Sequence, residues 1–361
     1  MSTWKFNWLT AWDETQDAAA VAEWQARCTG ATAAHVFFEP SLVNAWTETY
    51  RPLRRLEPRF LTVSRGNSSA FLPLVLDRTT WKDACMRVLQ PVGHNEFDYH
   101  DTIMSWEPGA TSAAKGTLST EFWTALLDEL RKRGDDFDLC LIPRIRAQTA
   151  PPAANPVDVA PFIDLSRHPS FEAFMASRSG NLRQGLKRKQ RHLADLGAVQ
   201  FKVYAPEQAT HALDSLSEFR KNHEIRWPRA YRAPGLFENL IKHTLPSGLL
   251  HLSTIECGGR VASWHFGFVH NNRFYWYVPA YSKDFSRFSP GLLHIARLIE
   301  ECYRLGVTTF DFLRGDERYK YEWTSDQVRL CSLEIPGSSP GSGAKSLARS
   351  LLRGAAGLLR R

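Results

Sequence analysis

Acidic and basic side chains gather near the end of one predicted buried strand, where they could transfer a proton. The strand is Val307–Leu313, and these candidate catalytic residues are Asp311, Asp316, Glu317 and Lys320. A carboxylate at this place can remove the proton of an acceptor alcohol or amine during acyl transfer. Asp311 lies inside a mostly apolar segment, which is costly unless the carboxylate is paired or functional. Two structural alternatives for Asp311 are a salt bridge and a capped backbone amide. Lys320 could instead pair with an acid, bind an anionic substrate group, or be a solvated surface lysine.

A helix start further upstream could bind an anion. Ser289 is suited to be the N-cap of the amphipathic run Leu292–Leu305, and Pro290 to be its first residue. The unpaired amides at a helix N-terminus attract phosphates. We therefore expect an anion site at Ser289 and Gly291, although the same residues also suit an ordinary helix start.

Several aromatic and polar side chains could bind an acceptor. Trp227 could stack on a sugar ring, although a packed Trp at a helix end is an equally good interpretation. Trp264 and His265 are adjacent on one strand, so only one of them can face a cleft. The candidate substrate-binding residues are His223, Arg226, Trp227, Trp264 and Tyr319.

The segment His94–Asp101 carries His94, Glu96, Asp98 and His100 at alternate positions. Same-face residues of a strand are nearly 7 Å apart, so four of them do not easily surround one ion. We expect polar lining of a cleft here and assign no metal.

Composition limits the class of protein. The chain has 361 residues, 43% of them hydrophobic, which is enough for two domains with buried cores. The six cysteines include no Cys-x-x-Cys pair and read as buried small hydrophobes. No apolar run is long enough to cross a bilayer and no secretory leader is evident, so we expect a cytoplasmic enzyme.

The first half, which we assign as a domain over 1–150, contains several short apolar runs. Arg59–Val63 and Ala70–Leu76 predict a hairpin. The other expected elements are strands at Met86–Pro91, Phe97–Met104 and Asp138–Ile142 and a helix at Ser119–Lys132. The Pro-rich stretch Arg146–Pro161 is the expected connection between domains.

The second half, assigned as 151–336, predicts an α/β unit with largely antiparallel strands. It is expected to begin with a strand at Phe162–Leu165, helices within Ser170–Leu196, a strand at Val199–Tyr204 and helices near Glu207–Ile225 and Ala233–Leu245. A meander follows over Leu249–Cys257, Arg260–His270 and Arg273–Ala280, because Gly258-Gly259 and Asn271-Asn272 suit tight hairpins.

A meander followed by a loop, a helix and a strand resembles the core of the GNAT acyltransferase fold. The phrases Phe310–Trp323, Phe274–Tyr277 and Ser289–Gly291 resemble the CelD/BcsL-like family of putative acetyltransferases associated with cellulose and exopolysaccharide biosynthesis. That family is similar to the Fem-type aminoacyl transferases, which pair two GNAT-like domains. The resemblance implies tandem GNAT-like domains in an α/β fold, with a degenerate N-terminal copy.

The resemblance also implies acetyl-CoA as co-substrate. Its pantetheine arm would lie along the strand edge at Tyr277 and Val278. Its phosphates would meet the loop Ser282–Gly291, with Lys283 and Arg287 as charge partners. This loop shares only Arg287 and Gly291 with the usual Gln/Arg-x-x-Gly-x-Gly/Ala pattern of the fold.

Two segments carry the basic charge. Six Lys/Arg lie in 177–196 and five in 341–361, within a chain of net charge +7. The first segment reads as a solvated helix or as a site for an anionic partner, including tRNA in a Fem-like enzyme. We expect 337–361 to be a flexible linker and an amphipathic helix that binds an anionic membrane surface, a partner protein or the protein's own surface.

The resulting hypothesis is an acyltransferase that moves an acyl group from acyl-CoA to a hydroxyl or amine of a polysaccharide or cell-envelope precursor by direct attack. The alternatives are an aminoacyl-tRNA-dependent transferase and an inert nucleotide-binding scaffold. Fold alone does not separate these three.

Overall fold

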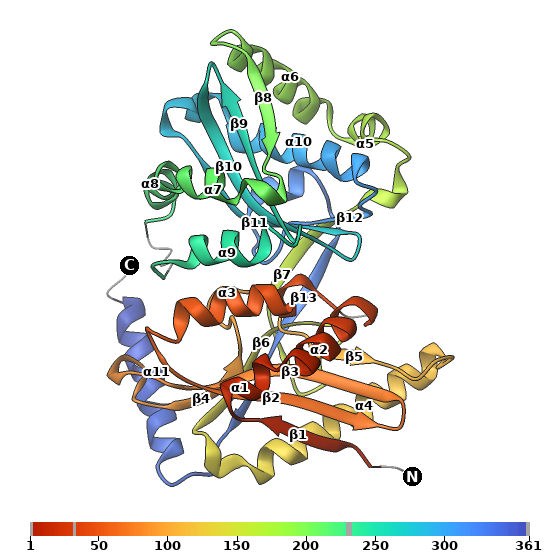
Figure 1. Cartoon of the computed structure of the whole chain (residues 1–361), viewed down its shortest axis with the longest axis vertical. Helices are drawn as coiled ribbons and strands as arrows, with labels where there is room; N and C mark the ends of the chain where they lie inside the picture. Colours follow the sequence, from red (N-terminus) through yellow and green to blue (C-terminus); the bar gives the residue numbers. More distant parts are fainter. Residues whose placement is uncertain (1–2, 32–33, 229–232, 359–361) are drawn as a thin grey trace. The chain divides into compact units, whose positions relative to one another are not determined.

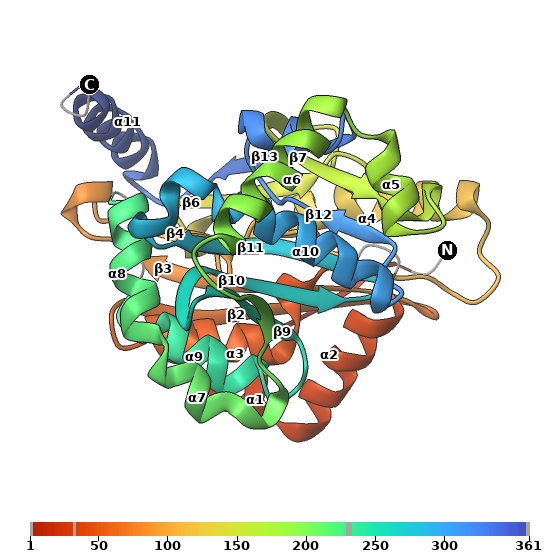
Figure 2. The ribbon, with the colours of Figure 1, turned by 90° about the horizontal axis from the view of Figure 1, so that it is seen from above.

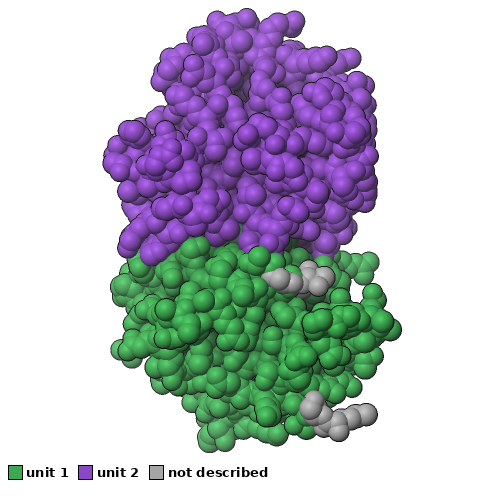
Figure 3. All heavy atoms as spheres, turned by 45° about the vertical axis from the view of Figure 1, so that its right-hand side comes forward, with its two compact units in different colours: residues 1–157, 329–361 green, residues 158–328 purple. Residues whose placement is uncertain are grey.

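The computed structural model describes residues 3–31, 34–228 and 233–358. The chain divides into two compact units (Figure 3). Unit 1 contains residues 1–157 and 329–361, and unit 2 contains residues 158–328. Unit 2 is therefore an insertion between two segments of unit 1.

Unit 1 is built on a mostly antiparallel sheet in which, among the described strands, only β4 and β6 run parallel. The strands in spatial order are β1 (Lys5–Leu9), β2 (Arg55–Arg65), β3 (Ser68–Arg78), β4 (Arg87–Pro91), β6 (Leu139–Arg146) and β13 (Gln327–Pro336), and β5 (Ile103–Ser105) pairs with β3. β2 and β3 form the expected hairpin, closed by Gly66 at positive φ. The connection expected over Arg146–Pro161 is shorter in the structure, because residues 155–161 already belong to the next strand.

Helices cover both faces of this sheet (Figure 1). The helices of unit 1 are α1 (Trp12–Gln16), α2 (Ala18–Gly30), α3 (Pro40–Tyr50), α4 (Ser112–Lys132) and α11 (Ser342–Leu358), with short 3₁₀ turns η1 (Val36–Phe38), η2 (Trp81–Asp83) and η3 (Gly134–Asp136). Trp24 of α2 packs edge-on against Phe60 and tilted against Phe71 of the sheet. The Trp8 indole of β1 donates to Glu129 of α4.

Unit 2 contains the expected meander. Its strands in spatial order are β7 (Asn155–Asp164), β12 (Thr309–Asp311), β11 (Arg273–Tyr281), β10 (Arg260–His270), β9 (Leu250–Cys257) and β8 (Val199–Val203). The two hairpin links, Gly258-Gly259 and Asn271-Asn272, all have positive φ, as two-residue hairpins of this kind require. In the part of unit 2 that the structure describes, β11 and β12 are the one parallel pair.

Helices also cover both faces of the unit 2 sheet, and Figure 2 shows the two sets apart. One face carries α5 (Phe171–Ser177), α6 (Gly180–Ala194) and α10 (Pro290–Arg304), and the other carries α7 (Ala209–Asp214), α8 (Leu216–Arg226) and α9 (Leu236–Thr244). The remaining turns are η4 (Leu165–Arg167), η5 (Pro206–Gln208), η6 (Lys283–Phe288) and η7 (Arg318–Glu322). The α/β fold class with largely antiparallel sheets is confirmed.

Two expectations on organisation were wrong. Within the strand expected over Phe97–Met104, residues 97–102 are irregular with a bend at Asp98, and strand structure begins only with Ile103–Ser105. Residues 329–336, assigned to the second domain, group with unit 1 because β13 pairs with β6. The expected linker after them is tied down, since the Ser338 and Ser339 hydroxyls donate to Asp135 and Asp138.

The C-terminal helix α11 docks on unit 1 through its cations. The Lys345 ammonium lies 2.9 Å from Asp138, and the Arg349 guanidinium 3.8 Å from Asp83 of η2. The apolar side chains of Leu347 and Leu351 remain 65% and 67% exposed. The helix therefore presents these two leucines to solvent.

A glycine in β10 provides a test of the side-chain packing on the unit 2 sheet. A Cβ at Gly267 would lie 2.5 Å from the His265 ring and 2.9 Å from the Tyr275 carbonyl oxygen. We predict that Gly267→Ala lowers the free energy of unfolding by about 1–3 kcal/mol in urea denaturation. The matched control, Gly185→Ala in α6, meets no atom within 4 Å and should raise it by about 0.5–1 kcal/mol. Equal stability of the two variants would contradict this packing.

Candidate active site

One edge of β11 is unpaired over part of its length, because the neighbouring strand β12 ends early. β12 pairs with β11 only from Arg273 to Tyr275, whereas β11 runs on to Tyr281. The chain beyond β12 turns at Leu313, whose φ is 60°, and follows β7 instead. There the Gly315 amide donates to the Val159 carbonyl oxygen over 2.9 Å. Within the described ranges, no strand pairs with the far half of β11 on this side.

A cavity of about 370 Å³ lies at this open edge, and we call it the β11 cavity. Its volume suits a small-molecule site. It is lined by Lys189, Trp227, Trp276, Pro279, Tyr281, Ser286, Ser289, Gly291, Leu292, Ile295, Tyr319 and Glu322. These residues come from α6, the end of α8, β11, the η6–α10 junction and η7.

The start of α10 forms one wall. Ser289 adopts a left-handed conformation with φ 49°, and its side chain does not cap the helix. Instead the Ser289 carbonyl oxygen accepts from the amides of Leu292 and Leu293 over 3.0 and 3.3 Å. The Gly291 amide makes no hydrogen bond to the residues that the structure describes. The expected N-cap position is thus correct, but the expected side-chain cap is not formed.

The loop before α10 offers fewer free backbone amides than a phosphate-binding loop would. It winds into η6, in which the Phe285 amide donates to Ser282 and the Ser289 amide to Ser286. These amides are consequently satisfied within the loop, and the free Gly291 amide is what the helix start offers to an anion.

One cation and one anion line the β11 cavity. Lys189 comes from α6 and Glu322 from η7, and neither has an ion-pair partner among the described residues. Tyr319 of η7 adds a hydroxyl that can donate or accept a proton. That hydroxyl accepts from the Trp276 indole over 3.2 Å. The wall therefore holds a carboxylate and a phenol close to an aromatic surface.

Two buried histidines, His265 of β10 and His294 of α10, have rings close to that of Trp276. The His265 ring stacks on Trp276 with centroids 4.0 Å apart. The His294 ring nitrogens lie 2.9 and 2.8 Å from the hydroxyls of Ser253 and Ser263. Burial lowers the pKa of His294 to about 3 and that of His265 well below its usual range. Both rings are therefore neutral at physiological pH.

Four of the candidate residues come together in this cavity. Trp227, Ser289, Gly291 and Tyr319 all line it, although they come from three separate segments of the sequence. Lys283 and Arg287 are exposed on η6 close by in sequence, and Tyr277 and Val278 lie on β11; these residues are not part of its lining. Their predicted contact with a co-substrate stays a prediction.

Asp311 and Lys320 are both buried, and they hold the backbone where it leaves β11. One Asp311 carboxylate oxygen accepts from Arg273 over 2.9 Å and the other from the Leu313 amide over 2.8 Å. The Lys320 ammonium donates to the carbonyl oxygens of Leu313, Arg314 and Gly315 over 3.2, 2.8 and 3.1 Å. Both structural alternatives for Asp311 are therefore present, and Lys320 is not a solvated surface lysine.

The other two acids lie on the same loop and are exposed. Glu317 pairs with the Lys320 ammonium over 2.8 Å. Asp316 accepts a hydrogen bond from the Tyr321 hydroxyl, which raises the pKa of Tyr321 to about 12. Neither acid lines the β11 cavity, and their catalytic role stays a prediction.

The remaining acceptor candidates lie elsewhere. Trp264 is buried on β10, at a position adjacent to His265 and thus on the opposite face of the sheet. His223 is buried in α8, where its ring lies 5.7 Å from that of Phe219. The side chain of Arg226 lies outside those that the structure describes.

Sequence reasoning missed Lys189, Trp276, Tyr281 and Glu322 as cavity residues. Lys189 belongs to the basic segment and Glu322 to the Phe310–Trp323 phrase, so both lay in segments already of interest. Charge alone did not indicate which of many cations and acids would face one cavity, because that depends on how α6 and η7 pack.

Comparison with known proteins supports an acyltransferase. Residues 180–321, which include most of the cavity lining, match the family model described as acetyltransferase (GNAT) domain. No curated protein sequence matches the chain. The prediction that the protein is an acyltransferase with a GNAT domain is thereby confirmed, whereas the narrower CelD/BcsL-like resemblance is not tested by this match.

Solved structures share the fold over most of the chain. FemX is similar with a TM-score of 0.62 at 10% identity, over 91% of this chain and 98% of FemX. The C-terminal domain of a putative lysylphosphatidylglycerol synthetase from Agrobacterium fabrum gives 0.56 at 11% identity, over 92% and 96%. A conserved protein of unknown function from Bacteroides thetaiotaomicron gives 0.52 at 11% identity, over 91% and 99%. At these identities the likeness is one of fold.

The contacts of Lys320 generate a prediction. Lys320→Met removes a buried donor from three carbonyl oxygens, of which that of Leu313 is itself buried, so we expect a loss of about 1.5–3 kcal/mol in the free energy of unfolding. The control is Arg318→Met, an exposed cation of the same turn, which should change it by less than about 0.5 kcal/mol. If Lys320→Met unfolded like the wild type while losing activity, a direct chemical role would replace the structural one.

Proposed function

We propose that the protein transfers an acyl group from acyl-CoA to a hydroxyl or amine of a polysaccharide or cell-envelope precursor, and that the reaction takes place in the β11 cavity. The observation that carries this proposal is the meeting of three features in one cavity: an open strand edge, a helix start with a free amide, and the Tyr319 and Glu322 side chains. The GNAT domain match over residues 180–321 supports the acyl donor chemistry.

The donor would lie along the wall formed by Pro279, Tyr281 and the start of α10. The apolar side chains of Leu292 and Ile295 suit a pantetheine arm. The Gly291 amide and the Lys189 ammonium are the groups of the cavity that attract phosphate. Lys283 and Arg287, which do not line the cavity, would add positive charge near the phosphates.

Glu322 is the general base in this proposal. Its carboxylate takes the proton of the acceptor hydroxyl or amine while the acceptor oxygen or nitrogen bonds to the thioester carbon. Collapse of the tetrahedral intermediate breaks the carbon–sulfur bond, and the Tyr319 hydroxyl donates its proton to the leaving sulfur. No covalent enzyme intermediate is required. Asp316 and Glu317, the exposed acids of the same loop, are the alternative bases.

A saccharide acceptor is supported by Trp227. This side chain is 42% exposed and lines the cavity, so its ring offers a stacking surface for a sugar. The resemblance of the Phe310–Trp323 phrase to the CelD/BcsL-like family adds the association with exopolysaccharides.

An aminoacyl-tRNA donor is the second candidate. The observation that favours it is the loop before α10, where most amides are satisfied internally and few remain for a CoA pyrophosphate. The likeness of fold to FemX fits this alternative. The cations of α6 would then face the tRNA backbone.

One substitution tests the chemistry. We predict that Glu322→Gln lowers kcat by about 10²-fold or more with little change in acetyl-CoA affinity, because it removes a base without changing shape. Glu207→Gln, which alters an exposed acid of η5, is the control. Donor hydrolysis and transfer should be followed with acetyl-CoA and with aminoacyl-tRNA. Activity with the tRNA alone would select the second candidate, and inactivity with both would leave the nucleotide-binding scaffold.

We further propose that the enzyme works at an anionic membrane surface from the cytoplasmic side. No helix in the described ranges is both long and apolar enough to cross a bilayer. However, α11 packs against η2, and the exposed Leu347 and Leu351 lie on the same unit as Trp81, which is 70% exposed. Tryptophan and cations beside an apolar stripe are typical of interfacial helices.

This attachment predicts selective vesicle binding. The double variant Leu347→Ser/Leu351→Ser should bind phosphatidylglycerol vesicles at least about 10-fold more weakly than the wild type, because two leucines lose their burial in the interface. Leu53→Ser, another exposed leucine of unit 1, is the control. Equal binding to phosphatidylcholine vesicles, or no effect of the double variant, would refute it.

A further inference from the structure

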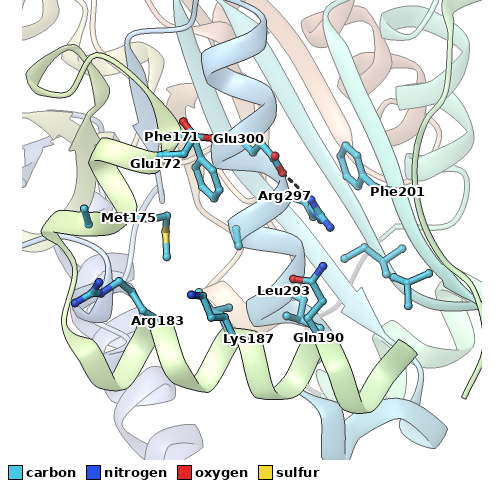
Figure 4. Close-up of a pocket in the computed structure, with 15 residues that line it drawn as sticks. Phe171, Glu172, Met175, Arg183, Lys187, Gln190, Phe201, Leu293, Arg297 and Glu300 are labelled. Carbon is cyan, nitrogen blue, oxygen red and sulfur yellow. Dashed lines mark hydrogen bonds and ion pairs between the residues drawn. The ribbon is translucent and has the colours of Figure 1, made fainter. Parts of the chain in front are cut away.

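Unit 2 contains a second cavity, separate from the β11 cavity. It measures about 430 Å³ and lies between α5, α6, α10 and β8 (Figure 4). We call it the α6–α10 cavity. It is lined by Phe171, Glu172, Met175, Ala176, Arg183, Leu186, Lys187, Gln190, Val199, Phe201, Ile255, Leu293, Ala296, Arg297 and Glu300.

The floor of this cavity is apolar. Phe171 and Met175 of α5, Phe201 of β8, and Leu293 and Ala296 of α10 all contribute to it. These side chains are only partly buried or pack at the edge of the unit 2 core. An apolar surface left accessible in a concave site favours a ligand with a hydrocarbon part.

The rim of the cavity is positively charged on the α6 side. Arg183 and Lys187 are one helical turn apart, and Figure 4 shows both on the stretch of α6 that borders the cavity. Neither has an ion-pair partner in the part of the chain that the structure describes. In contrast, the Arg297 guanidinium is 2.8 Å from the Glu300 carboxylate. Two uncompensated cations therefore border an apolar floor.

The acid on the opposite rim, Glu172, forms no ion pair with these two cations in the described part of the chain. Glu172 stands at the start of α5, where a hydrogen bond from the Ser170 side chain lowers the pKa of its carboxyl. Its negative charge is thus stabilised locally at the helix N-terminus. The α6 rim stays available for an external anion.

We propose that the α6–α10 cavity binds a single-chain lipid phosphate, with the hydrocarbon chain on the apolar floor and the phosphate between Arg183 and Lys187. A phosphate monoester carries about 1.5 to 2 negative charges at neutral pH, which matches two cations better than a carboxylate does. A guanidinium also binds phosphate through two parallel hydrogen bonds.

The site is distinct from the catalytic one although both use α10. Leu292 and Ile295 face the β11 cavity, whereas Leu293 and Ala296 face the α6–α10 cavity. Coenzyme A and the lipid phosphate should therefore bind together, and the proposal does not depend on the identity of the acyl donor.

Decyl phosphate, used below its micellar concentration, is the test ligand. Calorimetric titration of the full chain with saturating coenzyme A should show one site. Decanoate, 1-decanol and inorganic phosphate should each bind at least about 10-fold more weakly, because decanoate carries a smaller charge, 1-decanol carries none, and inorganic phosphate has no hydrocarbon chain. Arg183→Ala/Lys187→Ala should weaken decyl phosphate by about 10-fold or more, and Ala296→Phe should fill the floor and weaken it similarly.

The control is Arg188→Ala/Arg191→Ala, which removes two exposed cations of the same helix outside the cavity lining. It should leave decyl phosphate affinity unchanged. Equal weakening by the control, displacement by coenzyme A, or equally tight binding of 1-decanol would overturn the proposal. Circular dichroism of each variant shows that it is folded. Failure of coenzyme A to bind would count against the acyl-CoA function and not against this site.

Discussion

The proposed active site depends on the early end of the pairing between β12 and β11, at Tyr275. A parallel neighbour that continued would cover the strand edge, and no cavity would exist there. Asp311 and Lys320 fix the departure, since one binds the Leu313 amide and the other gathers the carbonyl oxygens of the next turn. Buried charges of this kind are tolerated because each is paired and hydrogen-bonded. The open edge is therefore maintained by electrostatics within one short loop.

This arrangement gives the two ends of the Phe310–Trp323 phrase different tasks. Its first part holds the backbone in place, and its last part, in η7, presents Tyr319 and Glu322 to the cavity. Because Lys320 lies between those two residues and is anchored to the turn, the position of the chemical groups is set by the same contacts that open the edge. The contacts that open the edge and the side chains of the proposed chemistry thus lie within fourteen consecutive residues.

Much of unit 2 could be predicted from the sequence, because its signals are local. The Gly258-Gly259 and Asn271-Asn272 links fix the meander, and Pro290 fixes the start of α10. The site was harder to predict. Asp311 has the composition of a catalytic acid, and only its contacts with Arg273 and Leu313 show that both carboxylate oxygens are engaged. Glu322 and Lys189 meet through tertiary packing, which no spacing reveals. In unit 1, β13 returns to β6 after an insertion of 171 residues, and this pairing has no local signal.

The late position of β13 in the sequence also affects how the chain folds during its synthesis. A ribosome completes residues 158–328 before it makes β13, so the inserted unit has its full sequence while its host still lacks a strand. Until then, β6 has an edge without its antiparallel neighbour, and such edges promote aggregation in unfinished chains. Residues 329–361 thus complete a unit whose other segment, residues 1–157, is made before the insertion.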